Sequence, residues 1–299
     1  MAAATAIPTS LFARPFQSEA DYEAMRRLVV EGLALTGLPV YATIGNLDWW
    51  RAAEDDPRGV YNVRLWFAGP ERLVAFAWPV DDQVDIVVHP DFPALHAAAL
   101  AWAEEYFRPA PAFRAWAFTG DAARIAALTE RGYRRTDKGL VAYGQATAGA
   151  AAPSLPPGYT IRPVRGPEES EARVAVQRAA FESEWMTIER YARVRASPTY
   201  RPELDLVIET PDGDVAGFAL LWLDAANRLG VFEPLGVAAA YQRRGLGRAL
   251  MLAGLRCLGD RGADYALVET GRDYEACGLY EATGFTLLDT NFAWVSPNS

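Results

Sequence analysis

The sequence predicts a mixed α/β fold that occurs twice in tandem, in a domain over residues 1–150 and a second over residues 151–299. Apolar stretches of strand length alternate with stretches of helical period along the whole chain. Residues 144–158 are rich in Ala, Pro and Gly and are typical of a linker, with the boundary near Ala151. The order of elements before this linker recurs after it, which indicates a duplicated domain.

Two pairs of short motifs support the duplication. Arg14-Pro15 recurs as Arg162-Pro163, 148 residues later. Gly132-Tyr133, at the end of a predicted helix, recurs as Gly284-Phe285, 152 residues later. Two nearly equal offsets are better explained by a repeated domain than by chance.

In the first half, apolar runs predict strands over residues 13–16, 60–67, 73–79, 84–88, 113–118 and 139–143. Helical periodicity predicts helices over residues 19–35, 93–108 and 121–132. Asp121 can cap the third of these helices, and Gly132 can end it. Residues 37–59 are expected to be irregular. Their Trp49-Trp50 pair is predicted either to line a pocket or to pack in a core or interface.

In the second half, strands are predicted over residues 160–163, 204–209, 215–223, 231–237, 264–270, 286–289 and 292–295. Helices are predicted over residues 168–180, 246–258 and 273–283. Residues 211–214 read Pro-Asp-Gly-Asp, which is a hairpin signal between two of the strands. Residues 182–203 are expected to be irregular.

Composition excludes several classes of protein. A hydrophobic share of 51% and a charged share of 22% are those of a soluble globular protein, and no apolar run is long enough to span a membrane. A net charge of −9 argues against nucleic-acid binding. Two cysteines, no disulfide framework and an N-terminus unlike a signal peptide predict a cytoplasmic protein. With only His89 and His96 and no Cys/His cluster, no metal site is expected.

The segment from Val231 to Leu258 combines a short apolar strand, a loop with two glycines and an amphipathic helix. This order presents unpaired backbone N–H groups at the start of the helix, where an anion can bind. Gly245 and Gly247 lack a Cβ, so a phosphate can approach the backbone there. Positive charge beside them comes from Arg243, Arg244 and Arg248. The segment therefore predicts a pyrophosphate site; the alternative is a solvated basic turn before an ordinary helix.

Two better-known phosphate loops do not match this segment. No lysine follows Gly247, and Leu250 stands where a dinucleotide fingerprint needs its third glycine. The run from Gln242 to Gly247, preceded by Leu235-Gly236-Val237, resembles the acyl-CoA loop of the GNAT superfamily of N-acyltransferases. The tandem arrangement resembles the two-domain branch of that superfamily that includes mycothiol synthase.

The resemblance implies two GNAT-like domains, each with a mostly antiparallel sheet and flanking helices. It implies acetyl-CoA as co-substrate and transfer of the acetyl group to an amine of a small molecule or peptide. No Ser/His/Asp or Cys/His set supports a covalent route, so direct attack in a ternary complex is expected. The residues that the resemblance places at the cofactor are Leu235, Gly236, Val237, Gln242, Arg243, Arg244, Gly245, Leu246, Gly247, Arg248 and Asp273.

Glu233 is the candidate base, because burial in an apolar strand would raise the pKa of its carboxyl toward a useful value. The alternative is a glutamate on a half-exposed strand, and Glu269 on the next strand is a second candidate. Pro234 fits either an interrupted inner strand, where the family admits the thioester arm, or an edge strand.

The segment from Asp273 to Phe285 resembles the family motif whose tyrosine protonates the leaving thiolate. This makes Tyr280 the candidate acid, the alternative being a packing aromatic. Asp273 departs from the Asn that the family often has, but it can still cap the helix.

The first half lacks the acyl-CoA loop. Residues 93–95, Pro-Ala-Leu, offer neither glycine nor cation where the loop should follow, and no tyrosine takes the place of Tyr280. We therefore expect residues 1–150 to form a degenerate, non-catalytic domain and residues 151–299 to form the catalytic one. The acceptor pocket is expected to draw on residues 37–59 and 182–203. The alternative function is a CoA-binding or sensing protein without turnover, and the sequence assigns no oligomeric state.

Overall fold

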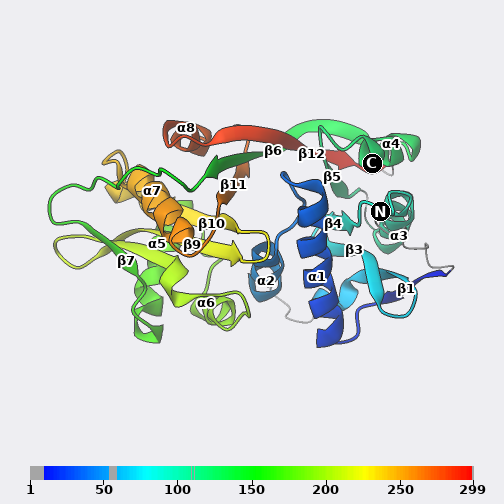
Figure 1. The fold of residues 1–299 in the computed structure, drawn as a ribbon, viewed down its shortest axis with the longest axis horizontal. Helices are drawn as coiled ribbons and strands as arrows, with labels where there is room; N and C mark the ends of the chain where they lie inside the picture. Colours follow the sequence, from blue (N-terminus) through cyan, green and yellow to red (C-terminus); the bar gives the residue numbers. More distant parts are fainter. Residues whose placement is uncertain (1–9, 54–58, 109, 111, 298–299) are drawn as a thin grey trace, which may run out of the picture. The chain divides into compact units, whose positions relative to one another are not determined.

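The computed structural model describes residues 10–53, 59–108, 110 and 112–297, which fold into two compact mixed α/β units (Figure 1). Unit 1 comprises residues 1–43, 56–139 and 289–299, and unit 2 comprises residues 44–55 and 140–288. The first nine residues, which carry the prediction that the N-terminus is unlike a signal peptide, lie outside the described part. None of the helices in that part is both long and apolar enough to cross a membrane.

The two units differ from the ranges 1–150 and 151–299 at three places. The chain enters unit 2 at Leu140, a short helix from the first half belongs to unit 2, and the last residues from Asp289 belong to unit 1. Composition marks Ala151 as a linker, yet β6 (Arg134–Ala146) already pairs with a strand of unit 2 through residues 140–146. Strand pairing is a long-range property that a local excess of Ala and Pro does not report. The different roles expected of the two halves stay predictions.

Unit 1 contains strands in the order β1-β2-β3-β4-β5-β12. Neighbours are antiparallel except β4 and β5, which run parallel and share the single register pair Gln83↔Arg114. The strands are β1 (Leu11–Pro15), β2 (Arg64–Ala68), β3 (Arg72–Val80), β4 (Gln83–Val88), β5 (Arg114–Phe118) and β12 (Thr286–Val295). The helices are α1 (Glu19–Thr36), α3 (Leu95–Tyr106) and α4 (Ala122–Glu130). The predicted cap is confirmed, because the Asp121 side chain accepts a hydrogen bond from the Arg124 N–H.

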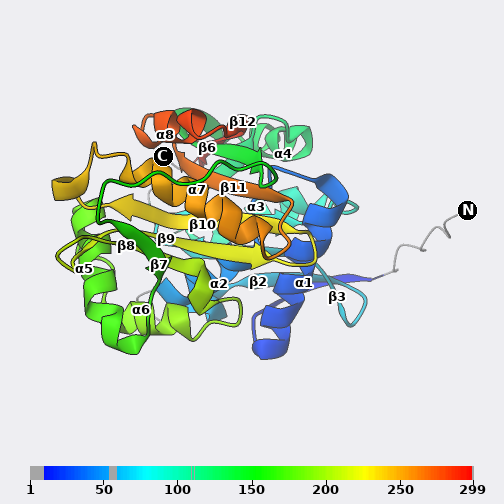
Figure 2. The same cartoon turned by 60° about the vertical axis from the view of Figure 1, so that its left-hand side comes forward.

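Unit 2 contains strands in the order β6-β11-β10-β9-β8-β7 (Figure 2). Only β10 and β11 run parallel, so the mostly antiparallel sheet is confirmed. The strands besides β6 are β7 (Thr160–Pro163), β8 (Asp205–Glu209), β9 (Val215–Asp224), β10 (Leu229–Val237) and β11 (Tyr265–Gly271). The helices are α2 (Ile44–Ala53), α5 (Ser170–Phe181), α6 (Ile188–Arg195), α7 (Leu246–Gly259) and α8 (Ala276–Ala282).

The two faces of the unit 2 sheet are covered by different helices. Leu206 and Ile208 of β8 pack in the cluster that holds the buried side of α7, whereas Val207 packs in the cluster that holds Val176 of α5. Because successive side chains of a strand point to opposite faces, α7 and α5 lie on opposite faces of the sheet. The predicted helix stripe of α7 is confirmed, with Leu246 and Leu250 fully buried in the core.

Four predictions of secondary structure are wrong. Residues 44–53 and 188–195 were expected to be irregular but form α2 and α6. Their helices are short, and tertiary packing supplies the stability that their local pattern does not show. The last two predicted strands form one continuous strand, β12. α8 begins at Ala276 rather than Asp273, so Asp273 does not cap it.

Candidate functional site

The strand β10 separates from β11 at the point where the sequence places Glu233 and Pro234. The parallel register runs from Leu229↔Tyr265 to Phe232↔Val268 and ends there in the described structure. Pairing with β9 shifts register across the same two residues and resumes at Leu235↔Ala219. Proline has no N–H to donate, which suits this interruption. β10 lies between β9 and β11, so the interpretation of Pro234 as an edge-strand residue is wrong.

Beyond this point Leu235, Gly236 and Val237 pair with β9 on one side only. The side that faced β11 has no strand partner there in the described structure, so a backbone N–H that points to this side is a candidate donor to a carbonyl oxygen. A Cβ at Gly236 would lie 2.8 Å from the Cβ of Ala180 on α5, so α5 packs directly against this strand end. The separation thus opens the sheet immediately beside Glu233.

Burial raises the pKa of the Glu233 carboxyl to about 7, against a smaller opposing effect from a hydrogen bond that Asn46 donates. The side-chain amide of Asn46 donates to Oε2 of Glu233. Glu233 keeps partial solvent access, so a substrate can still reach it. A carboxyl with this pKa changes charge near neutral pH, which is what a general base needs. Glu269, the second candidate, is exposed on β11.

Asn46 belongs to α2, a helix that sequence reasoning missed. A Cβ at Gly45 would lie 2.5 Å from Trp222 of β9, so glycine lets the helix lie directly on this ring. The indole N–H of Trp222 donates to the Glu233 carbonyl oxygen at 2.7 Å. Farther along α2, Asp48 accepts from the backbone N–H of Thr199 at 2.9 Å. The local signal for this role was weak, because it consisted of one glycine beside one amide, shortly before a pair of tryptophans.

The predicted pyrophosphate loop forms a turn before α7 that fits an anion. Gly245 is the N-cap of α7 at φ 79°, and Arg243 also lies in the left-handed region at φ 60°. Backbone N–H groups in such a turn converge on one point and bind anions. The space that a Cβ at Gly245 would enter is open. A Cβ at Gly247 would lie 3.2 Å from Leu279, so the packing of α7 on α8 is a second reason for glycine there.

The polar residues of the loop hold it in place. Gln242 donates from its side-chain amide to the Val237 carbonyl at 3.1 Å, which ties the loop to the end of β10. Arg244 donates to the Tyr159 hydroxyl at 3.0 Å, and Arg243 pairs with Glu275 at 2.9 Å. Leu246 is buried beneath the loop, whereas Arg243, Arg244 and Arg248 are exposed. These arginines therefore surround the turn with positive charge on its solvent side.

Asp273 lies in the turn before α8, and its side chain contacts the neighbouring Arg272 at 3.5 Å. The expected helix cap is absent, since the N-cap position of α8 is Glu275. Asp273 is exposed, so a contact with the cofactor arm stays a prediction.

Tyr280 lies in α8 and is buried, with only 6% of its surface exposed. Its ring packs edge-on against Tyr143, with centroids 5.8 Å apart. Burial and the neighbouring Cys277 raise its pKa to about 12, partly opposed by a hydrogen bond with Thr270. The hydroxyl therefore holds its proton at neutral pH, as a proton donor must. The structure thus gives Tyr280 both a packing role and a chemical state compatible with the predicted one.

The corresponding segment of unit 1 uses its backbone N–H groups internally. The N–H of Phe92 donates to the His89 carbonyl, and the N–H of Leu95 donates to the Phe92 carbonyl, both at 2.9 Å. The N–H of Asp91 donates to Nδ1 of His89 at 3.1 Å. Groups paired in this way are not available to a phosphate. Among the residues that the structure describes, no group of His, Cys, Asp or Glu is arranged to hold a metal ion.

Comparisons with known proteins show that the chain is an acyl-CoA-dependent N-acyltransferase. Residues 172–285 match the acetyltransferase (GNAT) family. A mycothiol acetyltransferase of Kineococcus radiotolerans is 32% identical over 221 residues, which cover 71% of each chain. One from Streptomyces avermitilis is 29% identical over 298 residues, 93% of this chain and 92% of that one. The chain belongs to the GNAT acetyltransferase family.

Solved structures show the same fold over nearly the whole chain. A GCN5-related N-acetyltransferase from Sphaerobacter thermophilus has a TM-score of 0.68 at 20% identity and covers 97% of this chain and 96% of its own. A tandem GNAT protein from the clavulanic acid biosynthesis pathway has a TM-score of 0.69 at 17% identity, with coverage of 97% and 99%. The predicted tandem GNAT architecture is therefore confirmed.

Proposed function

We propose that this protein transfers the acetyl group of acetyl-CoA to the amine of a small molecule by direct attack, and that unit 2 performs the reaction. The observation that carries the proposal is Glu233, a carboxyl of pKa about 7 at the point where β10 leaves β11. The relatives named mycothiol acetyltransferase support a small-molecule acceptor over a peptide. A cytoplasmic location stays a prediction.

In the proposed mechanism the turn around Gly245 holds the pyrophosphate of acetyl-CoA through backbone N–H groups and the surrounding arginines. The unpaired side of Leu235–Val237 donates a backbone N–H to the thioester oxygen, where negative charge develops. Glu233 accepts the proton that the amine must lose to attack the carbonyl carbon. As the C–N bond forms and the C–S bond breaks, the Tyr280 hydroxyl gives its proton to the departing sulfur and regains one from solvent.

The alternative function, binding of CoA without turnover, needs neither Glu233 nor Tyr280. A pure binder gains nothing from a carboxyl whose charged form is disfavoured by burial, because that burial costs stability at neutral pH. A Glu233 carboxyl whose pKa is raised by burial and which accepts a hydrogen bond from Asn46 therefore favours an enzyme over a pure binder.

The test is the release of free CoA thiol from acetyl-CoA with a panel of amines. Glu233→Gln is expected to lower kcat/KM by about 100-fold or more, since a general base contributes roughly that much. Glu269→Gln, a change of the same type on the neighbouring strand, is the matched control and should stay within about twofold of the native protein. Equal activity of Glu233→Gln and the native protein would refute the assignment of the base. Failure to bind acetyl-CoA by calorimetry would refute the function itself.

Asn46 is a positioning residue in this scheme. Its hydrogen bond lowers the pKa of Glu233, whereas burial raises it, so the two effects together set the value near 7. Asn46→Ala should therefore move the acid limb of the pH profile of kcat/KM to higher pH. A merely structural role would lower activity without moving that limb.

A further inference from the structure

A small cavity beside Glu233 has walls that are almost entirely apolar. Its volume is about 260 Å³, and its apolar lining residues are Trp49, Phe181, Trp185, Met186 and Pro234. Pro234 directly follows Glu233 in the chain, and Trp49 lies on the helix whose Asn46 donates to Glu233, so the cavity lies near the proposed base. We call this space the aromatic cavity.

The two polar residues that also line the aromatic cavity each have one side-chain oxygen in a hydrogen bond within the protein. The side-chain oxygen of Gln177 accepts a hydrogen bond from Arg173 at 2.9 Å. The Ser183 hydroxyl accepts from the Trp185 N–H at 3.2 Å. None of the described lining residues has a charged side chain. A ligand that brings charges or many hydroxyls into this space would lose more hydrogen bonds to water than two polar side chains can replace.

The walls of the aromatic cavity come in part from α2 and from the loop between α5 and α6. Trp49 lies three residues after Asn46 on α2, so both can face the same side of that helix. Trp49 contacts Trp185, with ring centroids 6.0 Å apart and a tilt of 47°. Trp185 belongs to the loop of residues 182–187 between α5 and α6. The helix that orients the base therefore also builds the cavity.

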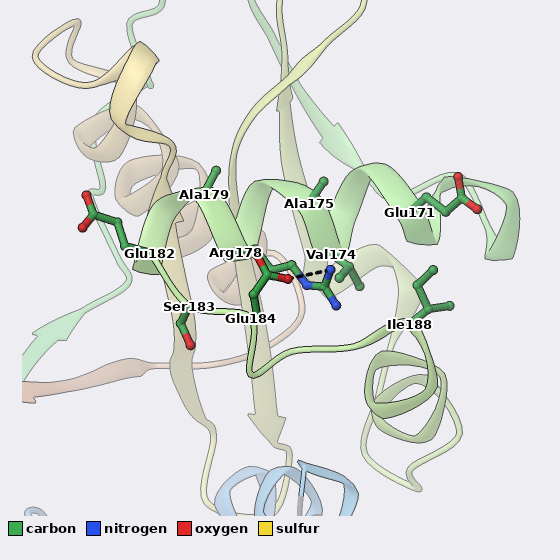
Figure 3. A pocket seen from close by; sticks show the side chains of 9 residues that line it. All are labelled: Glu171, Val174, Ala175, Arg178, Ala179, Glu182, Ser183, Glu184 and Ile188. Carbon is green, nitrogen blue, oxygen red and sulfur yellow. Dashed lines mark ion pairs between the residues drawn. The ribbon is translucent and has the colours of Figure 1, made fainter.

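Two arginines, one from each flanking helix, form hydrogen bonds and an ion pair with the 182–187 loop. Figure 3 shows Arg178 reaching from α5 to Glu184, a pair with a distance of 2.9 Å between Nη1 and Oε2. Nε of the same arginine donates to the Met186 carbonyl at 2.7 Å. Arg190 of α6 donates to the Trp185 carbonyl, and its guanidinium lies 4.9 Å from the centre of that indole ring. The loop thus has a fixed conformation that keeps Trp185 and Met186 on the cavity wall.

We propose that the aromatic cavity binds the carbon skeleton of the acceptor, and that the acceptor is a small primary amine with an uncharged, apolar group next to its amino group. The volume limits that group to about one ring or a short branched chain, since cavities for drug-sized ligands begin near 300 Å³. The inference rests on the proposed function, because it takes Glu233 to be the base that the amine approaches. It excludes polyols and polycations as preferred acceptors.

The test compares 2-phenylethylamine, glucosamine and spermidine as acceptors of the full-length protein. Rates are expressed as kcat/KM per unprotonated amine, so that differences in amine pKa do not decide the order. We expect 2-phenylethylamine to exceed the other two by about tenfold or more, the effect of burying one apolar group. A preference for glucosamine or spermidine would overturn the inference but leave the proposed function standing. Absence of turnover with every amine would overturn the proposed function and the inference with it.

Substitutions in the wall can distinguish a loss of acceptor binding in the aromatic cavity from a general loss of activity. Trp185→Ala and Trp49→Ala should each lower kcat/KM for 2-phenylethylamine by about tenfold and leave the slower amines nearly unchanged. Trp50→Ala is the matched control, being the same change one position along α2 at a residue that does not line the cavity. Equal losses for all three amines in Trp185→Ala would contradict the assignment.

Phe181→Asp tests whether a substitution in the cavity wall can change the preferred acceptor rather than only lower the activity. Phe181 is 49% exposed, so the substitution should be tolerated by the fold. A carboxylate at this wall attracts a cation and repels an apolar group, so the preference should shift from 2-phenylethylamine toward spermidine by at least about tenfold. An unchanged order of preference would show that the acceptor does not enter the aromatic cavity.

Discussion

Replacing Glu233 with glutamine should abolish most activity and at the same time stabilise the protein. Burial raises the pKa of Glu233 from its ordinary 4.5 to about 7, which corresponds to at most about 3 kcal/mol of free energy of unfolding. The sign follows from proton binding: between these two pH values the folded protein holds the proton more tightly than the unfolded chain. The native protein therefore loses stability as pH rises from about 4.5 to about 7. Glutamine never ionises and can still accept the hydrogen bond from Asn46, so the variant escapes this loss.

The assay is urea unfolding of the native protein and Glu233→Gln at a series of pH values from 4.5 to 8.5. The difference in free energy of unfolding should be near zero at pH 4.5, grow through pH 7 and stay constant above it, with several °C in Tm at pH 8. Taking the difference between two proteins cancels the titration of groups they share. Glu269→Gln, the same change at an exposed position, should not give a difference that grows through pH 7. A variant that is less stable than the native protein at pH 8, or a difference that does not vary with pH, would refute the burial argument.

Further substitutions probe the acid, the loop and the core. Tyr280→Phe should lower kcat by about tenfold or more while acetyl-CoA still binds, as measured by thiol release and calorimetry; an unchanged kcat would leave Tyr280 only its packing role. Gly245→Ala should cost about 1–2 kcal/mol in urea unfolding because φ is 79° there, and a neutral result would show that the turn relaxes. Asp205→Asn should destabilise by about 3–5 kcal/mol, since it leaves the fully buried Arg173 without its partner at 2.9 Å. Folding at native stability would mean that this pair is replaceable.

Several features could be predicted from the sequence because their causes are local. Positive φ at Gly245, the strand before it and the apolar stripe of α7 all arise within one continuous segment. The N-cap Asp121 is likewise a contact between residues three apart. Such contacts leave a pattern of residue types at fixed spacing, and the pattern is sufficient to place the element. The position of this turn, the predicted acyl-CoA loop, therefore follows from the residues alone.

The remaining features depend on distant parts of the chain. Asn46 lies 187 residues from Glu233, and the 44–53 segment has too little local pattern to predict even its helix. Its place is decided by packing on Trp222, which a glycine at position 45 permits. The sequence by itself determined that a strand carries a glutamate and that a glycine-containing turn and a helix follow it. Only the tertiary structure decided how far the carboxyl is buried, which partner opposes the resulting rise in its pKa, and which aromatic walls lie beside it. Contacts between residues so far apart have no spacing for a pattern to reveal.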